Sequence, residues 1–310
     1  MKIRHCILLA SALLLSWSLK AQEQLPANEV FEFLSFPRGV AQTGMAGAGK
    51  SLLSESTALA AFDNPAVLPF ALNHVDATVI YGRWAPAQTN TLSNNLAGGV
   101  SVRLGKGFAM SAAVINQAHA EVDFGGENGK FSPKDLIVAF GAGASFGDYV
   151  SVGVSARLVQ QQVMADYKLS STAITAMIQY HKDALNVAAG LANLGSGVKS
   201  ENDNVSSLPS SARVAASHEL PAGPGALTCA LDADYYFSGK IGVSAGVAYG
   251  FKDMLFARAG YRYASAGAAF PSHLALGLGA KWKGFGLDVS YLTANAQIGN
   301  SLCLGISCRF

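Results

Sequence analysis

The sequence has 310 residues, of which 50% are hydrophobic and only 14% charged, and it contains 33 glycines. This apolar content excludes a disordered chain, because enough apolar surface is available to offset the entropy lost on folding. The charged fraction also argues against an ordinary soluble enzyme, in which about 25% of residues are charged. The composition therefore favours a chain whose surroundings are not mainly water.

Residues 1–21 have the pattern of a secretory signal peptide. Lys2 and Arg4 precede an apolar run at residues 7–15, and Ala21 is a small residue suited to cleavage. The alternative, a single membrane anchor, needs a longer apolar run of about 20 residues. Removing residues 1–21 leaves 19 basic against 20 acidic residues. The mature chain therefore lacks the basic surface of nucleic-acid-binding proteins, and no nucleic-acid partner is predicted.

Residues 22–72 form a distinct N-terminal segment, because they lack the alternating pattern of the rest of the chain. Residues 51–61 predict a helix, which Asn64-Pro65 would end. The apolar residues of this segment need burial. We therefore expect a hatch folded into the lumen of a wide barrel, and the alternative is a loose periplasmic tail.

Residues 44–51 of this segment match the phosphate-binding pattern G-x-x-x-x-G-K-S. In nucleotide-binding enzymes the loop amides and the lysine hold phosphates, and a buried strand runs directly into the loop. Residues 37–43 do not resemble such a strand, and an exported chain has no access to cytoplasmic ATP. Close packing of the hatch explains the glycines better, so no nucleotide cofactor is predicted.

Residues 73–310 are dominated by strict alternation of apolar with small or polar residues. Val150, Val152 and Val154, for example, share one face, while Ser151 and Ser155 share the other. A period of two indicates β-strands with one apolar face. Fourteen such runs are predicted, centred near Val79, Val100, Ala112, Phe140, Val154, Ala176, Ala189, Val214, Leu231, Ala245, Ala259, Leu276, Leu287 and Leu304.

The expected fold class is all-β: a 14-stranded antiparallel transmembrane β-barrel with the N-terminal hatch in its lumen. Lipid offers no partners for backbone groups, so a membrane-spanning sheet must close on itself. A water-soluble sandwich would instead expose charges, but here the second face is mostly Gly, Ser and Ala. Every second link is short, such as Gly147-Asp148, and most others, such as residues 118–134, are long and polar. This arrangement is typical of the outer membrane of Gram-negative bacteria, so outer-membrane lipids are the expected surroundings.

Side chains of a strand alternate between its two faces, so every second residue of a predicted strand faces the lumen. Several of these inward positions carry a charge. An inward charge needs water or a partner of opposite charge. One interpretation is that these groups pair with each other and contact the hatch, and the other is that they line a path for an ion or a substrate. The predicted lumen charges are Arg103, Arg157, Arg213, Arg258, Arg262, Arg309, Lys281, Asp232, Asp234 and Asp288.

Two segments match the nucleophile pattern G-x-S-x-G, around Ser145 and Ser244. A nucleophile elbow needs a sharp strand-to-helix turn, whereas both serines lie within or at the end of alternating strands. The histidines and cysteines of the mature chain show no metal-ligand spacing. No catalytic residue, metal or other cofactor is therefore predicted, and an outer-membrane esterase is kept only as a third hypothesis.

The last predicted strand ends at Phe310, an aromatic residue on the apolar face. A terminal aromatic of this kind resembles the signal that the outer-membrane assembly machinery reads. We expect Phe310 to serve as that assembly signal.

The N-terminal segment also carries a family resemblance. Phe31-Glu32-Phe33-Leu34-Ser35-Phe36-Pro37-Arg38 is followed by Gly44-Met45-Ala46-Gly47-Ala48-Gly49 and then by Asp63-Asn64-Pro65-Ala66-Val67-Leu68. This series resembles the N-terminal signature of the PorV/PorQ family, outer-membrane barrels of the type IX secretion system. The F-x-F-L-x-x-P opening looks more like the PorQ branch. The hatch residues that the resemblance marks are Phe31, Phe33, Pro37, Arg38, Gly44, Gly47, Asn64 and Pro65.

The family is similar to the fatty-acid transporter fold, a fourteen-stranded barrel with an N-terminal plug. The resemblance implies a non-enzymatic role, because PorQ-like members help to hold the cell-surface complex that processes secreted cargo and joins it to lipopolysaccharide. It implies PorZ as a partner, and through PorZ the sortase-like PorU and the cargo shuttle PorV. The alternative function is an outer-membrane transporter of hydrophobic small molecules, which rests on analogy of fold.

Overall fold

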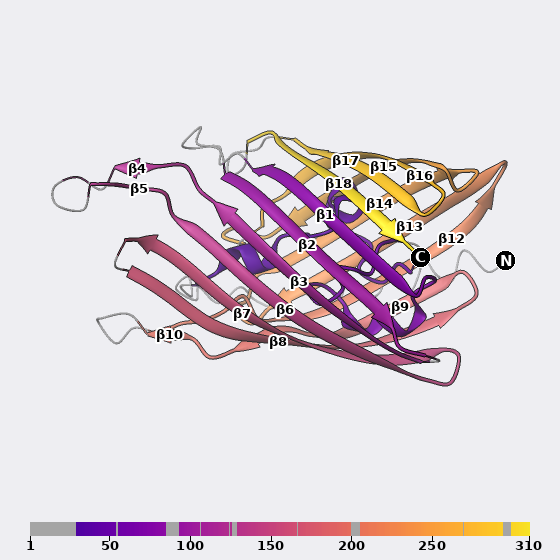
Figure 1. Cartoon of the computed structure of the whole chain (residues 1–310), viewed down its shortest axis with the longest axis horizontal. Helices are drawn as coiled ribbons and strands as arrows, with labels where there is room; N and C mark the ends of the chain where they lie inside the picture. The colour runs from indigo at the N-terminus through magenta and orange to yellow at the C-terminus, as the bar shows by residue number, and fades with distance from the viewer. Residues whose placement is uncertain are drawn as a thin grey trace.

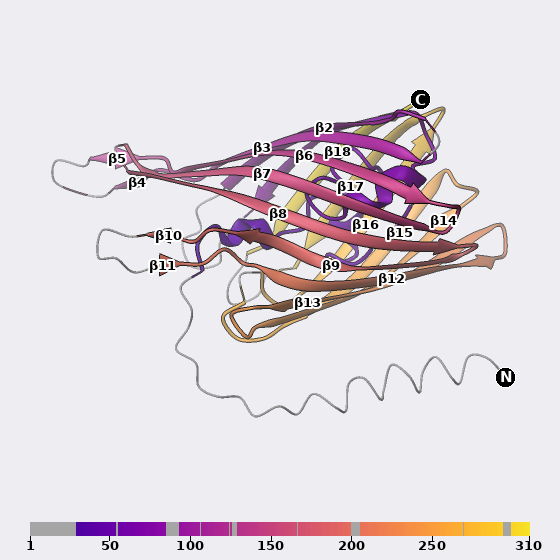
Figure 2. The same cartoon turned by 90° about the horizontal axis from the view of Figure 1, so that it is seen from below.

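The structure is a closed barrel that encloses the N-terminal segment of the chain (Figure 1). Seen from below, the short helical turns of that segment lie between the walls of the barrel (Figure 2). The expected fold class is confirmed. None of the described helices is long and apolar enough to cross a membrane. The computed structural model describes residues 29–53, 55–84, 93–105, 107–123, 125, 129–165, 167–199, 205–268, 270–293 and 299–310.

Fourteen strands form the barrel, and each predicted strand centre lies within one of them. Consecutive barrel strands pair antiparallel, and β18 pairs back onto β1, so the ladder closes on itself. Two short hairpins extend the links: β4 (Val122–Asp123) with β5 (Lys130–Phe131), and β10 (Val198–Lys199) with β11 (Val205–Ser206). The barrel strands are β1 (Val75–Trp84), β2 (Ser93–Arg103), β3 (Phe108–Ala118), β6 (Lys134–Phe146), β7 (Val150–Met164), β8 (Tyr167–Lys182), β9 (Leu185–Gly195), β12 (Ser211–Ala222), β13 (Gly225–Tyr236), β14 (Ile241–Phe251), β15 (Leu255–Ala264), β16 (His273–Trp282), β17 (Phe285–Leu292) and β18 (Ser301–Arg309).

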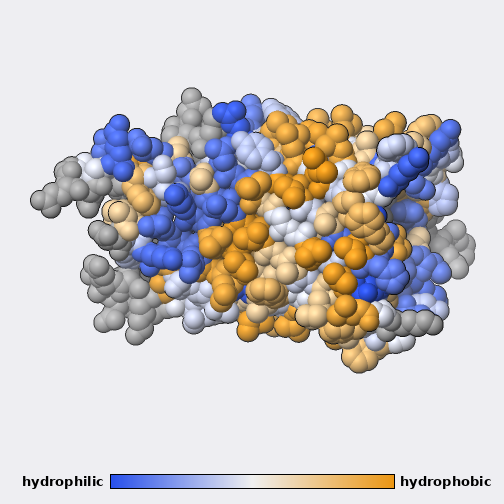
Figure 3. Space-filling view, in the orientation of Figure 1, coloured by the Kyte–Doolittle hydropathy of each residue, from blue (hydrophilic) through white to orange (hydrophobic). Residues whose placement is uncertain are grey.

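The alternation along the strands produces a barrel that is apolar outside and polar inside. In β7, Val154 and Leu158 are 54% and 57% exposed, whereas Ser151, Ser155 and Arg157 are buried. On the face shown in Figure 3, hydrophobic side chains form a belt between two more hydrophilic ends. Lipid can solvate such a belt, and the closed ladder leaves no sheet edge facing it. A water-soluble sandwich is therefore excluded.

The six links at one end of the barrel are turns of two to four residues. The β16–β17 link consists of Lys283 and Gly284, whose φ angles are 46° and 85°. A two-residue hairpin turn requires this left-handed conformation, and glycine adopts it without strain. Long links, including residues 119–133 and 196–210, leave the opposite end. Because outer-membrane barrels have short periplasmic turns and long outer loops, the short-turn end is periplasmic and the other end extracellular.

The N-terminal segment crosses the lumen as short helices and turns, and we refer to its described residues 29–72 as the hatch. Its helices are η1 (Glu32–Ser35), α2 (Val40–Gly44) and η2 (Pro65–Phe70). Helix α2 contacts β15 to β18, whereas η2 contacts β2, β3, β6, β7 and β8. Since these groups of strands lie on opposite sides of the barrel, the hatch bridges the lumen from wall to wall.

The helix predicted for residues 51–61 is wrong, because the described residues of this stretch form turns and bends. Barrel side chains bond the backbone here: Thr57 N donates to Asp76 Oδ2 at 2.7 Å. Such side-chain partners replace the bonds that a helix would make, and they come from strands distant in the sequence. Asn64-Pro65 begins η2 rather than ending a helix, since the Asn64 side chain accepts a bond from Ala66 N.

Candidate functional site

The hatch enters the lumen at the extracellular end. Glu29 forms a parallel bridge with Ser207, which lies in the long link between β9 and β12. Glu29 Oε2 also lies 3.0 Å from the Nζ of Lys240, in the link between β13 and β14. At the periplasmic end, Arg103 Nη1 donates to the carbonyl oxygen of Ala71 at 2.8 Å. The hatch therefore runs through the barrel from outside to inside before β1 returns along the wall.

This course predicts which side of the membrane each end of the hatch can be reached from. A protease site inserted directly before Glu29 should be cut when protease is added to intact cells. The same site inserted after Leu72, which is 72% exposed at the periplasmic end, should be cut only after the outer membrane is permeabilised. Immunoblotting of the barrel fragment measures both reactions. Cleavage of the first site only in permeabilised cells would contradict the direction of the hatch.

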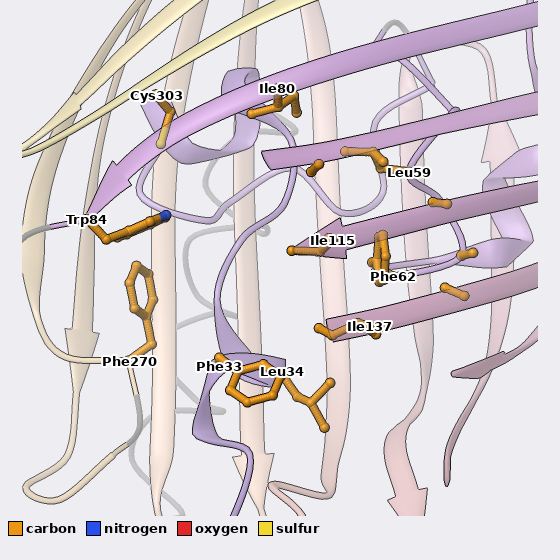
Figure 4. Close-up of a cluster of buried hydrophobic side chains, with 14 of the residues drawn as sticks. Phe33, Leu34, Leu59, Phe62, Ile80, Trp84, Ile115, Ile137, Phe270 and Cys303 are labelled. Atoms are coloured by element: carbon orange, nitrogen blue, oxygen red, sulfur yellow. The ribbon is translucent and has the colours of Figure 1, made fainter. Parts of the chain in front are cut away.

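An apolar cluster fills the extracellular part of the lumen. Phe33 and Leu34 of η1 are buried in it with side chains from β3 and β6 (Figure 4). Beside them, the rings of Phe36, Trp84 and Phe270 lie with centroids 5.0 to 6.0 Å apart. Trp84 ends β1 and Phe270 lies in the link between β15 and β16, so these rings join the hatch to the rim. Each such aromatic pair contributes about 0.5–1.5 kcal/mol beyond its buried area.

A buried ion cluster holds the middle of the hatch. Lys50 Nζ lies 3.2 Å from Asp232 Oδ2 and 3.6 Å from Asp234 Oδ2. The Nε of Arg213 lies 2.6 Å from Asp234 Oδ1, and Arg262 Nη1 lies 3.9 Å from its Oδ2. All five side chains are at most 7% exposed. Buried charges are tolerated when they are paired, so this cluster fastens the hatch to β12, β13 and β15.

A second ion cluster surrounds Glu55, closer to the periplasmic turns. Glu55 Oε1 lies 3.0 Å from Arg258 Nη2, and its Oε2 lies 3.8 Å from Lys281 Nζ. Arg258 Nη1 also lies 2.8 Å from Asp288 Oδ1. Burial alone would raise the pKa of Glu55, but Lys281, Arg258 and Arg309 together lower this pKa to about 2. Glu55 is therefore ionised at neutral pH and ties the hatch to β15 and β16.

The depressed pKa of Glu55 predicts an acid-sensitive contribution to stability. In the unfolded chain this carboxyl has a pKa near its ordinary value of 4.5. The stabilisation is therefore fully present above that pH and is lost as the pH falls from there toward about 2. We expect Glu55→Gln to lower the urea midpoint of unfolding clearly at pH 6 and progressively less below pH 4. A difference from the unmodified protein that stays constant over this range would contradict the assignment.

Two buried arginines in the lumen have no carboxylate within ion-pair distance among the residues that the structure describes. Arg157 is 2% exposed and donates to the side chains of Asn193 and Thr175. Arg38 is 6% exposed and donates to the carbonyl oxygen of Phe33. Neutral acceptors therefore satisfy part of their hydrogen-bonding capacity, and Arg38 fixes the turn after η1.

Close backbone contacts account for several hatch residues singled out from the sequence. Gly44 lies on Gly277 of β16, where a Cβ on Gly44 would come within 2.9 Å of the Gly277 Cα. Pro65 lies on Gly153 of β7, where a Cβ on Gly153 would overlap the Pro65 carbonyl carbon. Gly47 has a φ of 88°, which favours glycine. Glycines on both partners thus let the hatch backbone approach the wall closely.

The motifs that suggested catalysis lie in other structural contexts. Lys50 of the G-x-x-x-x-G-K-S segment pairs with lumen carboxylates. Ser145 lies in β6 and Ser244 in β14, so neither stands at a strand-to-helix turn. Ser244 donates its Oγ to the carbonyl oxygen of Ala46 at 2.8 Å, which holds the hatch in place. Within the described ranges, no group of three or more His, Cys, Asp or Glu side chains could hold a metal ion.

A small cavity lies between the hatch and β1, β17 and β18. Its volume is about 60 Å³, and its apolar lining includes Val40, Leu59, Val67 and Ile80. A second cavity of about 240 Å³ lies near the periplasmic turns, and Glu55 lines both cavities. The ladders between the described strands are closed all round the barrel, and the Glu55 ion cluster lies where the linings of the two cavities meet.

The alternating pattern locates the charges on the strands but not their partners in the hatch. Lys50 and Glu55 lie in a segment without periodicity, where parity assigns no direction to a side chain. The one signal available was the presence of charges in an otherwise apolar segment. Phe310 is 71% exposed at the periplasmic rim, and its N donates to Val75 O at 2.9 Å. Its role as an assembly signal stays a prediction.

Comparisons with known proteins bear on the fold. No protein-family model and no curated protein matches the chain. Among solved structures, the chain is similar to the monoaromatic hydrocarbon channel CymD, with a TM-score of 0.67 and 13% identity over 88% of this chain and 98% of that chain. It is also similar to the toluene transporter TodX of P. putida (TM-score 0.59, 12% identity, 88% and 99% covered). A third is a FadL homologue of Pseudomonas aeruginosa (TM-score 0.57, 12% identity, 88% and 98% covered). The chain thus has the FadL/TodX-like fold of outer-membrane barrels.

Proposed function

We propose that the protein is an outer-membrane channel for small hydrophobic molecules. The observation that carries this proposal is the fourteen-stranded barrel fold that it shares with CymD and TodX, a hydrocarbon channel and a toluene transporter. Likeness of fold is a weak warrant for function on its own. The cavity between the hatch and the wall adds support from the site, because apolar side chains such as Val40 of the hatch and Ile80 of β1 form part of its lining, beside charged ones such as Glu55.

The proposed route follows the wall formed by β1, β17 and β18. The apolar cluster around Trp84 closes this route on the extracellular side, and the Glu55 ion cluster closes it on the periplasmic side. A cavity of about 60 Å³ holds little more than water. Passage therefore requires the hatch to shift away from this wall, while the Lys50 ion cluster keeps it attached to β13 on the other side.

Uptake measurements test the proposal. Cells that lack the protein should accumulate a radiolabelled aromatic hydrocarbon more slowly, and the unmodified gene should restore the rate. Ile80→Trp should fail to restore it, because the indole fills the cavity that Ile80 lines. Val79→Trp is the matched control, since Val79 is 58% exposed on the outer face of the same strand. Uptake that is unchanged by deletion, or equally restored by both variants, would contradict the proposal.

A second candidate function is an anchor of the type IX secretion system. The specific observation in its favour is the hatch series from Phe31 to Leu68, which resembles the PorV/PorQ signature. In this role the barrel would be non-enzymatic and would hold a PorZ-like surface protein, and through it PorU and PorV. Attachment of the start of the hatch to extracellular links, through Glu29, is compatible with a surface partner.

Affinity purification tests the anchor. The tagged protein, extracted from membranes with mild detergent, should co-elute with a PorZ-like surface protein. Removal of the tag from the same strain provides the control for nonspecific binding. Recovery of the barrel alone, under conditions that keep another outer-membrane complex intact, would contradict this second function and leave the channel proposal unaffected.

A further inference from the structure

A Ser–His–Asp chain of hydrogen bonds lies at the extracellular end of the barrel. Ser93 Oγ is 2.9 Å from His119 Nδ1, and His119 Nε2 is 2.6 Å from Asp135 Oδ2. Ser93 begins β2, His119 directly follows β3, and Asp135 is the second residue of β6. These three strands are neighbours in the barrel. The group is separate from the ion clusters of the hatch and from the G-x-S-x-G serines.

The bonding pattern assigns the tautomer of the histidine. A carboxylate can only accept, so His119 Nε2 carries a proton and donates it to Asp135. In the neutral imidazole, His119 Nδ1 is then unprotonated and accepts the hydroxyl proton of Ser93. In catalytic triads an imidazole likewise acts as general base toward a serine while an acid orients it, and here the two ring nitrogens exchange places, with Nδ1 facing the serine. Such triads are recognised by geometry rather than by sequence position, and no local sequence motif marks these three residues.

The burial of the three side chains also suits this chemistry. Ser93 and Asp135 are 4% and 2% exposed, whereas the His119 side chain is 30% exposed. Asp135 Oδ1 has no hydrogen-bond partner in the part of the chain that the structure describes. A buried carboxylate with one hydrogen-bonded partner stabilises positive charge on that partner. Asp135 therefore favours the imidazolium that forms when Ser93 loses its proton.

We propose that Ser93, His119 and Asp135 form a site that hydrolyses carboxylic esters. Ser93 Oγ bonds to the ester carbonyl carbon while its proton moves to His119 Nδ1. The imidazolium then passes this proton to the departing alkoxide, so the alcohol leaves and the acyl group stays on Ser93. Water next attacks the acyl carbon and gives a proton to His119, which returns it to Ser93 as the carboxylic acid departs.

The position of the site indicates the kind of ester. Ser93 and Asp135 occupy buried, inward positions in the alternating patterns of β2 and β6. They therefore face the lumen at its extracellular mouth rather than the lipid. The substrate class is a small ester that arrives from the external water, and the activity does not depend on either function proposed above.

Active-site labelling of the full-length protein in detergent tests the proposal. A biotinylated fluorophosphonate should form an adduct that mass spectrometry locates on Ser93. Ser93→Ala should abolish both the adduct and the hydrolysis of p-nitrophenyl acetate, and Asp135→Asn should slow both by a factor of about 100 or more. Ser145→Ala is the matched control, because this serine lies in β6 outside the triad. It should behave as the unmodified protein does.

Folding of each variant is checked by heat-modifiable migration of the barrel on gels. The proposal is overturned if the folded, unmodified protein gains no adduct on Ser93. It is equally overturned if folded Ser93→Ala hydrolyses the ester at the unmodified rate. If Ser93→Ala does not fold, the site of the adduct in the unmodified protein decides alone. If the unmodified protein gains no adduct on Ser93 and Ser93→Ala is less stable than the unmodified protein, the three residues serve to hold the strand ends together.

Discussion

Asp234→Asn is expected to release the hatch from the lumen wall. The Asp234 carboxylate lies 2.6 Å from Arg213, 3.6 Å from Lys50 and 3.9 Å from Arg262. The amide leaves these buried cations with Asp232 as their remaining carboxylate in the cluster. Breaking a buried ion pair by removing one partner costs about 3–5 kcal/mol. The urea midpoint of unfolding should fall accordingly, and the conductance of the barrel in planar bilayers should rise.

Asp148→Asn is the matched control for this change. It removes the same charge from an exposed position in the turn between β6 and β7, where screening by water makes an ion pair worth at most about 1 kcal/mol. Its unfolding midpoint and conductance should equal those of the unmodified barrel. Equal behaviour of the two variants would mean that the buried cluster does not hold the hatch.

Gly153→Val is expected to push the hatch away from β7, in another part of the wall. A Cβ at Gly153 would overlap the carbonyl carbon of Pro65 and the N of Ala66, both of which are backbone atoms that cannot rotate away. Overpacking of this kind costs about 1–3 kcal/mol or more. Helix η2 should therefore leave β7, and the barrel should conduct ions while it keeps its heat-modifiable migration.

Gly98→Val provides the control for the steric prediction. Gly98 lies in β2, and a Cβ there would meet only the carbonyl oxygen of Thr78 at 3.7 Å, an ordinary contact. The same substitution should leave conductance at the level of the unmodified protein. If Gly153→Val also stays closed with an intact barrel, η2 does not plug the lumen.

The two changes act on different strands of the wall by different forces. Asp234 belongs to β13 and holds Lys50 electrostatically, whereas Gly153 belongs to β7 and holds Pro65 by shape. If conductance requires release of both contacts, each variant alone should conduct weakly and the double variant strongly. If one variant conducts as much as the double variant, that contact alone controls the plug.

The strands of the barrel could be predicted from the sequence because lipid imposes a simple rule on them. A strand between lipid and a filled lumen must alternate apolar and small residues, and this period of two is visible within ten residues, as in Val150 to Leu158. The direction of alternating side chains then follows from parity. Arg157 and Asp234, for example, are buried inside the barrel, as their positions predict.

The hatch could not be predicted in the same way, because no repeating solvent boundary shapes it. Residues 51–61 have the composition of a helix, yet their backbone and side chains bond to Asp76 and other groups on distant strands. The partners of Lys50 and Glu55, the cavity and the direction of the hatch depend on contacts across the lumen. Such contacts exist only once the barrel has closed.

The strand positions, the barrel and the inward charges can be predicted from the sequence, since each follows from local periodicity. Which charges meet depends on contacts across the closed barrel, and the pairing of its strands also brings Ser93, His119 and Asp135 together. Those three residues lie in or directly beside separate strands, 16 to 42 positions apart in the chain, and no local pattern links them. Pairing of neighbouring strands places them at one rim. This register joins residues that are distant in the chain, so the strands could be predicted from local patterns and the site could not.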